Sequence, residues 1–290
     1  MLHLLALWLL VRVAGRLPAR ALHAAATLAA ALAWALSPRL RSVTADHMRH
    51  ALGPAAAPRA LARAARGCVR SAAYYYADFA KLPYLRDAAP FDAVTRADGL
   101  HHWFDAADRG CGVIALSAHL GNPEFFCRAV AAISSELLIL TEPLRPPRLD
   151  RFVQATRATP GVRFAPAGLA GARAAIEVLR RGGAVAVLGD RDVLGTGTPV
   201  AFFGERAPLP TGVAELALRT GAAVVPAFAL RDGSGFRVVF DPPLALRRTG
   251  NRAADLAAAH RAVAAALQRG IARAPEQWFA LSPVWSGLAR

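Results

Sequence analysis

The sequence predicts an α/β fold, with a mixed central sheet flanked by helices and with membrane-associating helices at the N-terminus. From Phe91 onward, short β-branched apolar runs alternate with amphipathic stretches, a pattern typical of strands joined by crossover helices. Ahead of this region, residues 2–11 and 21–36 are almost wholly apolar. A chain of 290 residues can bury a full core but has no room for a second enzyme domain. We therefore expect anchoring helices over residues 1–40 and one folded domain over residues 41–290.

The two apolar runs predict helices that lie on a membrane surface or enter it halfway. A helix needs about 20 apolar residues to cross the bilayer core, and the second run is shorter. Trp8 and Trp34 would then lie near the lipid headgroups. Through Arg70 the chain has ten arginines and one acidic residue, Asp46, which favours an anionic membrane surface. A secretory signal peptide is disfavoured because no basic residue precedes the first apolar run.

The composition of the whole chain also favours a membrane surface. Hydrophobic residues make up 55% of the chain and its mean hydropathy is +0.31, which is high for a cytosolic protein. Basic residues outnumber acidic ones 35 to 20, and all but Lys81 are arginine, whose guanidinium pairs well with phosphate. A high isoelectric point is also typical of nucleic-acid-binding proteins. The chain has no zinc-finger spacing, basic zipper or aromatic-studded basic sheet motif, so we expect no nucleic-acid partner.

The cysteines and histidines do not suggest a disulfide framework or a metal site. The cysteines form an odd, widely separated set in apolar surroundings, which predicts reduced core residues in a cytosol-facing protein. One histidine pair shares a helix face but lacks a nearby carboxylate or cysteine companion, and a second pair is more typical of a surface. We therefore expect no metal and no bound cofactor. The residues are Cys68, Cys111 and Cys127, and the pairs His47 with His50 and His101 with His102.

Most elements follow from local patterns. Residues 44–86 alternate alanine and arginine and predict helices, with breaks at Gly67 and Pro83. The cluster Asp232–Gly235 predicts a hairpin. Residues 195–198 superficially suggest a phosphate loop, but they lack the Gly-Lys-Ser/Thr ending and a strand–loop–helix setting, and predict a mobile turn. The expected strands are 94–96, 112–118, 137–141, 184–188, 222–230 and 236–240, and the expected helices are 99–107, 124–133, 148–159, 171–181, 211–220 and 253–274.

One stretch joins a buried strand to a histidine and a carboxylate. The run 112–118 has the apolar composition of a central strand covered on both faces, and the turn Leu120–Asn122 ends on a residue that caps helices well. His119 therefore leaves the carboxyl end of a strand and Glu124 opens the next helix, beside the crevice where open α/β sheets bind ligands. A neutral imidazole there can take a proton from a hydroxyl, while a carboxylate fixes its tautomer and stabilises the imidazolium. The spacing alone is weak evidence, since the helix dipole also favours a first-turn glutamate.

Taken with six further segments, this stretch resembles the lysophospholipid acyltransferase superfamily, which carries a His-x4-Asp/Glu motif. The resemblance is to its branch of lipid A lauroyl/myristoyl acyltransferases and phosphatidylinositol mannoside acyltransferases. An Asp-Gln pair is more usual in the lipid A enzymes than the Asp-Arg-Asp found here, and tryptophan is more usual than Pro123. These departures concern the acceptor more than the reaction. The further segments are Thr141–Leu144, Gly189–Asp192 with Phe202–Gly204, Leu209–Gly212 with Val224–Pro226, and the tail Pro275–Phe279.

The resemblance implies that residues 41–290 form an acyltransferase domain with a glycerolipid acyltransferase-like fold. It would move a fatty acyl chain from a thioester co-substrate, acyl carrier protein or coenzyme A, to a hydroxyl of a glycolipid or phospholipid of lipid A or phosphatidylinositol mannoside type. The expected place is the cytoplasmic face of the inner (plasma) membrane, with the protein peripheral or half-inserted. His119 would be the general base and Glu124 its orienting carboxylate. The expected substrate-binding residues, which could instead form a structural ion-pair cluster, are Glu142, Arg157, Asp190, Arg191 and Asp192.

Two other functions stay open at the level of sequence. In an acyl thioesterase the same base would activate water, and free fatty acid would be released without an acceptor. A non-catalytic lipid-binding membrane protein would bind lipid whether or not His119 is present.

Overall fold

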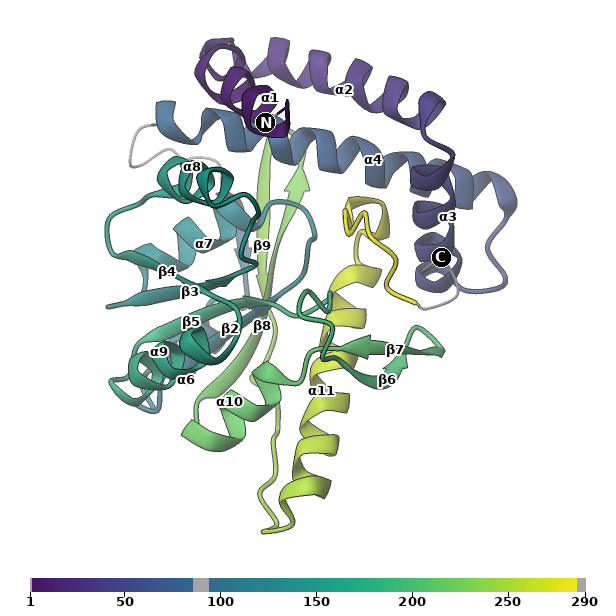
Figure 1. Cartoon of the computed structure of the whole chain (residues 1–290). Helices are drawn as coiled ribbons and strands as arrows, with labels where there is room; N and C mark the ends of the chain where they lie inside the picture. Colours follow the sequence, from purple (N-terminus) through teal and green to yellow (C-terminus); the bar gives the residue numbers. More distant parts are fainter. Residues whose placement is uncertain (1, 86–93, 286–290) are drawn as a thin grey trace.

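The structure is a computed structural model that describes residues 2–85 and 94–285, and it has the expected α/β architecture with a mixed central sheet (Figure 1). The seven strands lie in the order β1-β9-β8-β2-β5-β3-β4, and β8 and β9 are the one antiparallel pair of neighbours in this sheet. The predicted start of the α/β alternation at Phe91 lies outside the described residues. The strands are β1 (Val94–Asp98), β2 (Val113–Ser117), β3 (Leu137–Thr141), β4 (Val162–Pro166), β5 (Ala184–Leu188), β8 (Ala223–Asp232) and β9 (Gly235–Phe240).

The strand order reverses at the centre of the sheet. After β2 the chain forms β3 and β4 on one side, returns to β5 between β2 and β3, and later continues on the other side of β2 with β8. Strands β2 and β5 are parallel, and their last residues, Ser117 and Leu188, are paired. In open α/β sheets the crevice beyond the carboxyl ends of such central strands is the usual ligand site. The segments that begin at residues 118 and 189 therefore meet at this crevice.

Helices cover both faces of the sheet, which explains why its central strands are almost wholly apolar. Along β2, Val113 and Ala115 belong to a core shared with α6 and α7, whereas Ile114 and Leu116 belong to a core shared with α9, α10 and α11. This alternation is the two-residue period of a strand. The covering helices are α6 (His101–Ala107), α7 (Pro123–Ala132), α9 (Leu169–Arg180), α10 (Gly212–Thr220) and α11 (Arg252–Ala272).

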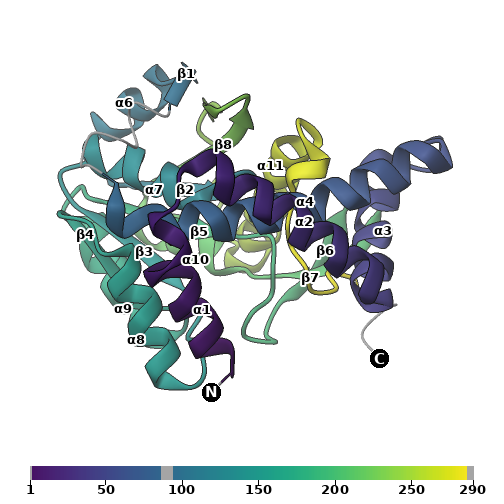
Figure 2. The same cartoon turned by 90° about the horizontal axis from the view of Figure 1, so that it is seen from above.

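The N-terminal helices form a layer across one end of the sheet (Figures 1 and 2). Helices α1 and α2 are outermost, and α4 lies between them and the sheet. A third apolar core joins Val11, Leu22 and Ala26 of the outer helices to Phe79 of α4 and to Phe125 of α7. The proposed boundary at residue 40 stays a prediction. The bounds are α1 (Leu2–Arg12), η1 (Ala14–Arg16), α2 (Ala19–Leu36), α3 (Pro38–Leu52), α4 (Pro58–Lys81), η2 (Leu82–Tyr84) and α8 (Pro147–Arg157).

Helix α2 is compatible with membrane association. Within the parts of the chain that the structure describes, it alone has the length and apolar composition of a membrane-crossing helix, and 17% of it is buried in the protein. Trp8 is exposed, as expected near headgroups. Trp34 is different, because it packs against the main core and Arg66 covers its ring at 5.6 Å. Trp34 is thus partly buried, and its place near the headgroups stays a prediction.

Three other local expectations differ from the structure. Gly67 does not break a helix but lies inside α4, where a β-carbon would be 2.7 Å from Cβ of Glu276, so the glycine permits close packing. Strands β6 (Thr198–Phe202) and β7 (Glu205–Leu209) pair as an antiparallel hairpin, whereas the sequence predicted no strand in this segment. Cys111 is exposed, whereas the other two cysteines are buried. The hairpin through Asp232–Gly235 and the end of α4 before Pro83 are confirmed.

Candidate active site

The side chain of His119 is hydrogen-bonded to Asp190. Nδ1 of His119 lies 2.9 Å from Oδ1 of Asp190, and the backbone N–H of His119 donates to Oδ2 at 3.1 Å. Each residue stands two positions beyond a strand end, after the paired residues Ser117 and Leu188. The register of β2 and β5 therefore brings together two residues that are 71 positions apart in the sequence.

Asp190 fixes the tautomer of this imidazole. Burial by itself would raise the pKa of Asp190, but the charge of His119 and hydrogen bonds from His119 and Trp278 outweigh it and leave the pKa below its usual value. An ionised carboxylate only accepts hydrogen bonds, so Nδ1 of His119 carries the proton. The lone pair is then on Nε2, for which the structure records no hydrogen-bond partner in residues 2–85 or 94–285. The side chain is 21% exposed, and the arrangement suits a general base.

The C-terminal tail supports this pair from behind. The indole N–H of Trp278 donates to Oδ2 of Asp190 at 2.8 Å, and both side chains are fully buried. The backbone N–H of Phe279 donates to the carbonyl of His119 at 2.8 Å. Leu120 forms a bridge with Trp278, and the N–H of Gly121 donates to the carbonyl of Gln277 at 3.1 Å. The tail thus has a local structural role that its sequence alone does not reveal.

The turn after His119 is held tightly in place. Gly121 has a φ of 62°, and a side chain there would collide with the carbonyl of Ala229. Asn122 is fully buried and caps α7, since its side-chain oxygen accepts from the N–H groups of Glu124 at 3.1 Å and Phe125 at 3.2 Å. The predicted cap is confirmed.

Glu124 belongs to a separate buried cluster. Its Oε1 accepts from the hydroxyl of Tyr75 at 2.8 Å and lies 2.9 Å from Nε of Arg157 on α8. The guanidinium of Arg157 also donates to the Tyr75 hydroxyl at 3.4 Å. Burial, reinforced by the charge of Glu124, raises the pKa of Tyr75. Burial would lower the pKa of Arg157, but the charge of Glu124 reverses that effect and raises it.

These contacts correct the expected pairing of His119 with Glu124. Within the described residues, the carboxylate bonded to the imidazole is Asp190, and Glu124 pairs with Arg157 and Tyr75. The physical reason is that the first turn of α7 directs Glu124 towards α4 and α8, whereas β5 brings Asp190 beside His119. Asp190, expected to bind substrate, is instead hydrogen-bonded to the imidazole of His119. Catalytic roles for His119 and Glu124 stay predictions.

The other predicted site residues lie along the same edge of the sheet. Glu142 follows β3, and its Oε2 lies 3.6 Å from the guanidinium of Arg191, which follows β5. Nε of Arg191 also donates to the hydroxyl of Ser282 at 3.1 Å. Asp192 has a different role, because its carboxylate accepts from the backbone N–H groups of Thr196 at 3.2 Å and Gly197 at 2.7 Å. It closes the following loop.

Two other histidines in the described ranges, His23 and His50, also contact a carboxylate. No group of three or more His, Cys, Asp or Glu side chains that could hold a metal ion occurs in the described part of the chain. His50 does have a carboxylate companion, contrary to expectation, because its Nε2 lies 2.9 Å from Oε2 of Glu205. A cavity of about 310 Å³ lies elsewhere, beside Cys111 and Ala223 at the amino ends of β2 and β8, far from His119.

Comparison with known proteins decides the family. The family of bacterial lipid A biosynthesis acyltransferases matches residues 4–286. The chain belongs to this family. It is 30% identical over 240 residues to a phosphatidylinositol mannoside acyltransferase of Mycobacterium tuberculosis. The aligned region covers 80% of this chain and 72% of that protein. A protein of the same name from Mycolicibacterium smegmatis is 27% identical over 224 residues, covering 76% of this chain and 71% of that protein.

Membership in the lipid A biosynthesis acyltransferase family confirms the resemblance noted from the motifs, and makes the chain an acyltransferase of lipid biosynthesis. For this family member, sequence reasoning found His119 and Asp190 but missed how they pair. It also missed Tyr75 and Trp278 as neighbours of the site. The available signals were three consecutive tyrosines at 74–76 and the tail 275–279.

Proposed function

We propose that the protein transfers a fatty acyl chain from an acyl thioester to a hydroxyl of a glycolipid or phospholipid of the lipid A or phosphatidylinositol mannoside type. The observation that carries the proposal is the His119–Asp190 pair at the central strand ends of a lipid acyltransferase. The donor is acyl carrier protein or acyl-coenzyme A, and the reaction needs no resident cofactor, because the thioester itself is activated.

The proposed reaction begins when Nε2 of His119 takes the proton of the acceptor hydroxyl as its oxygen attacks the thioester carbonyl. Asp190 stabilises the imidazolium that forms, in the way a buried carboxylate does in a catalytic triad. The tetrahedral intermediate then collapses, the C–S bond breaks, and the imidazolium returns its proton to the departing sulfur. The products are the acyl ester and a free thiol, and His119 is restored.

The proposed acceptor site lies over the charged side chains next to this pair. Glu142, Arg157 and Arg191 have side chains that are 42%, 20% and 25% exposed, so each can meet a polar headgroup while keeping its ion pair. Guanidinium groups suit a phosphate or a sugar, which fits the proposed acceptor class. Glu124 and Asp192 support this site through Arg157 and through the loop after β5, respectively.

The proposed location is the cytoplasmic face of the inner (plasma) membrane, where the protein is peripheral or half-inserted. Large apolar side chains are exposed on α1 and α2, including Leu5, Trp8, Leu28 and Leu32, and the exposed arginines Arg12, Arg16 and Arg20 lie on the same helices or between them. Exposed apolar area beside arginine is typical of helices that rest on anionic membranes. Seen from above, α1 and α2 form the outer side of the N-terminal layer (Figure 2).

The experiment is acyl transfer by the purified full-length protein, with acyl carrier protein and coenzyme A thioesters offered in parallel to mixed lipid acceptors. Mass spectrometry of the lipids would identify the acylated product and the preferred donor. We expect a product with wild type and almost none with folded His119→Ala. Release of free fatty acid alone would instead favour a thioesterase, and near wild-type transfer by folded His119→Ala would overturn the mechanism.

A further inference from the structure

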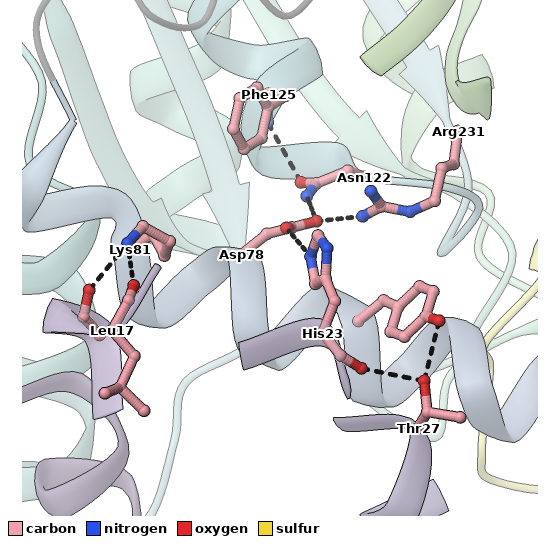
Figure 3. Close-up of polar contacts among 10 residues, drawn as sticks. Leu17, His23, Thr27, Asp78, Lys81, Asn122, Phe125 and Arg231 are labelled. Atoms are coloured by element: carbon pink, nitrogen blue, oxygen red, sulfur yellow. Dashed lines mark hydrogen bonds and ion pairs between the residues drawn. The ribbon is translucent and has the colours of Figure 1, made fainter. Parts of the chain in front are cut away.

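One buried carboxylate, Asp78 on α4, contacts three separate elements (Figure 3). Its Oδ1 accepts from Nε2 of His23 on α2 at 2.8 Å, and its Oδ2 accepts from the side-chain amide of Asn122 at 2.8 Å. Oδ2 also forms a close ion pair with Arg231 of β8. Asp78 is 8% exposed, so both of its oxygens are committed to protein partners in a water-poor environment.

Asp78 determines which way the amide of Asn122 faces. A carboxylate only accepts hydrogen bonds, so the NH₂ group of Asn122 must point to Asp78 and its oxygen must point to α7. That oxygen caps α7 through the N–H groups of Glu124 and Phe125. The backbone N–H of Asn122 is itself bound to the carbonyl of Ala229 at 3.0 Å. The orientation of one amide thus sets the start of the helix that carries Glu124, directly after the His119 turn.

His23 extends this network to the outer layer. Besides its contact with Asp78, its ring lies 4.9 Å from that of Tyr74. A second polar link between α2 and α4, from Thr27 to the hydroxyl of Tyr74 at 2.9 Å, does not contact Asp78 or Asn122. Of these two side-chain hydrogen bonds from α2 to α4, only the one from His23 reaches Asp78, which binds Asn122 of the turn after His119 (Figure 3).

We propose that Asp78 is a positioning residue that couples the seating of α2, through His23, to the alignment of the His119–Glu124 turn, through Asn122. This inference rests on the proposed function, because it concerns the geometry of that reaction. Loss of the network misaligns the turn without removing a reacting group. It therefore lowers kcat and leaves KM unchanged.

The test uses the full-length protein on vesicles and compares Asp78→Asn and His23→Ala with His23→Gln and Thr27→Val. In Asp78→Asn the new amide can donate as well as accept, so the orientation of Asn122 is no longer fixed. We expect its kcat to fall by about ten- to a hundredfold, as for a small misplacement of reacting groups, with KM unchanged. His23→Ala should lower kcat by a smaller factor, again with KM unchanged. His23→Gln keeps a hydrogen-bond donor and should restore the wild-type kcat. Thr27→Val should match wild type.

Hydrogen–deuterium exchange gives a readout that does not depend on turnover. The amides of Glu124 and Phe125 should exchange faster in Asp78→Asn and in His23→Ala than in wild type or Thr27→Val. Unchanged exchange of these two amides in both variants would overturn the proposal. Faster exchange combined with a wild-type kcat would also overturn it. So would an equal loss of kcat in Thr27→Val and His23→Ala. If Asp78→Asn fails to fold, His23→Ala carries the test. If the wild-type protein shows no acyl transfer, the proposed function is wrong. The exchange measurement would still decide whether His23 and Asp78 are coupled to the start of α7.

Discussion

At His119 a single hydrogen bond gives the two imidazole nitrogens different roles. Asp190 holds the proton on Nδ1, and Nε2 keeps the lone pair that a general base needs. Local sequence could identify the histidine, because it follows a recognisable buried strand. It could not identify the partner, because Asp190 reaches His119 through strand pairing between distant segments, while Glu124 was merely the nearest carboxylate downstream.

Replacing Asp190 with asparagine should remove most turnover while leaving a folded protein. An amide side chain can hold the imidazole in the wrong tautomer and cannot stabilise its charged form, so we expect kcat to fall by about 10²- to 10⁴-fold. The measurement is steady-state acyl transfer, with circular dichroism to verify folding. In the double variant with His119→Ala the losses should not multiply, because the two residues act as one unit. A multiplicative loss would show that Asp190 acts independently of His119.

Arg157→Ala should destabilise the protein strongly. It leaves the Glu124 carboxylate, whose side chain is 11% exposed, without its cation, and such a loss typically costs about 3–5 kcal/mol. Glu124→Gln combined with Arg157→Met should cost less, because no buried charge is left unpaired. Chemical denaturation would measure both variants. If Arg157→Ala instead keeps wild-type stability and raises KM, the main partner of the guanidinium is substrate rather than Glu124.

At the scale of elements, the sequence was most informative where burial and capping are local. Strand β2, the asparagine cap and helix α7 follow from an apolar run, a turn and a proline in direct succession. The β6–β7 hairpin was missed because its strands carry prolines and charged residues, and only some of their side chains, such as Phe202, reach the core. Gly67 was misread because its neighbour Glu276 is distant in sequence.

Helix α3 gives a prediction about pH. His47 is buried against Trp278, with ring centroids 4.8 Å apart, and its Nε2 has no hydrogen-bond partner in the structure as described. Burial lowers the pKa of His47 from 6.5 to about 4, although Asp46 and Asp190 partly oppose the shift. Between these values the unfolded chain binds a proton that the folded chain does not, so stability falls as the pH drops from 6.5 to about 4.

The contribution of His47 is on the order of 3 kcal/mol across that interval. His47→Phe keeps an aromatic ring but cannot titrate, so its free energy of unfolding should depend less on pH over the same range. Urea denaturation of both proteins at several pH values would measure the difference. Parallel curves for wild type and variant would show that His47 does not contribute to acid sensitivity.

At the scale of the whole molecule, apolar exposure is concentrated on the outer layer. Eight of the fifteen large hydrophobic residues exposed in the described ranges belong to the first 36 residues. Leu28, Leu32 and Leu36 follow at four-residue spacing, which places them on one face of α2, with exposures of 68%, 62% and 79%. The opposite face, with Leu22 and Ala26, packs against α4.

Changing these three leucines to serine should release the protein from vesicles without unfolding it. Each leucine that enters the membrane contributes about 1.5–3 kcal/mol, so the loss in partitioning should exceed about a hundredfold. Sedimentation with anionic vesicles would measure it. The matched control replaces exposed leucines outside this layer, Leu169, Leu194 and Leu281, and should bind as wild type does. Equal release of both variants would show that attachment does not depend on the face of α2.

The placement of His119 and Asp190 just past two paired strand ends also bears on how such chains tolerate change in length. The pair is determined by an offset of two positions beyond Ser117 and Leu188, and not by the length of the surface turns between β2 and β5. Insertions or deletions in surface turns of that segment, such as the one at Gly161, leave the offset intact. Deleting one residue between Ser117 and His119, or between Leu188 and Asp190, would move the two side chains apart, even though the chain would be only one residue shorter.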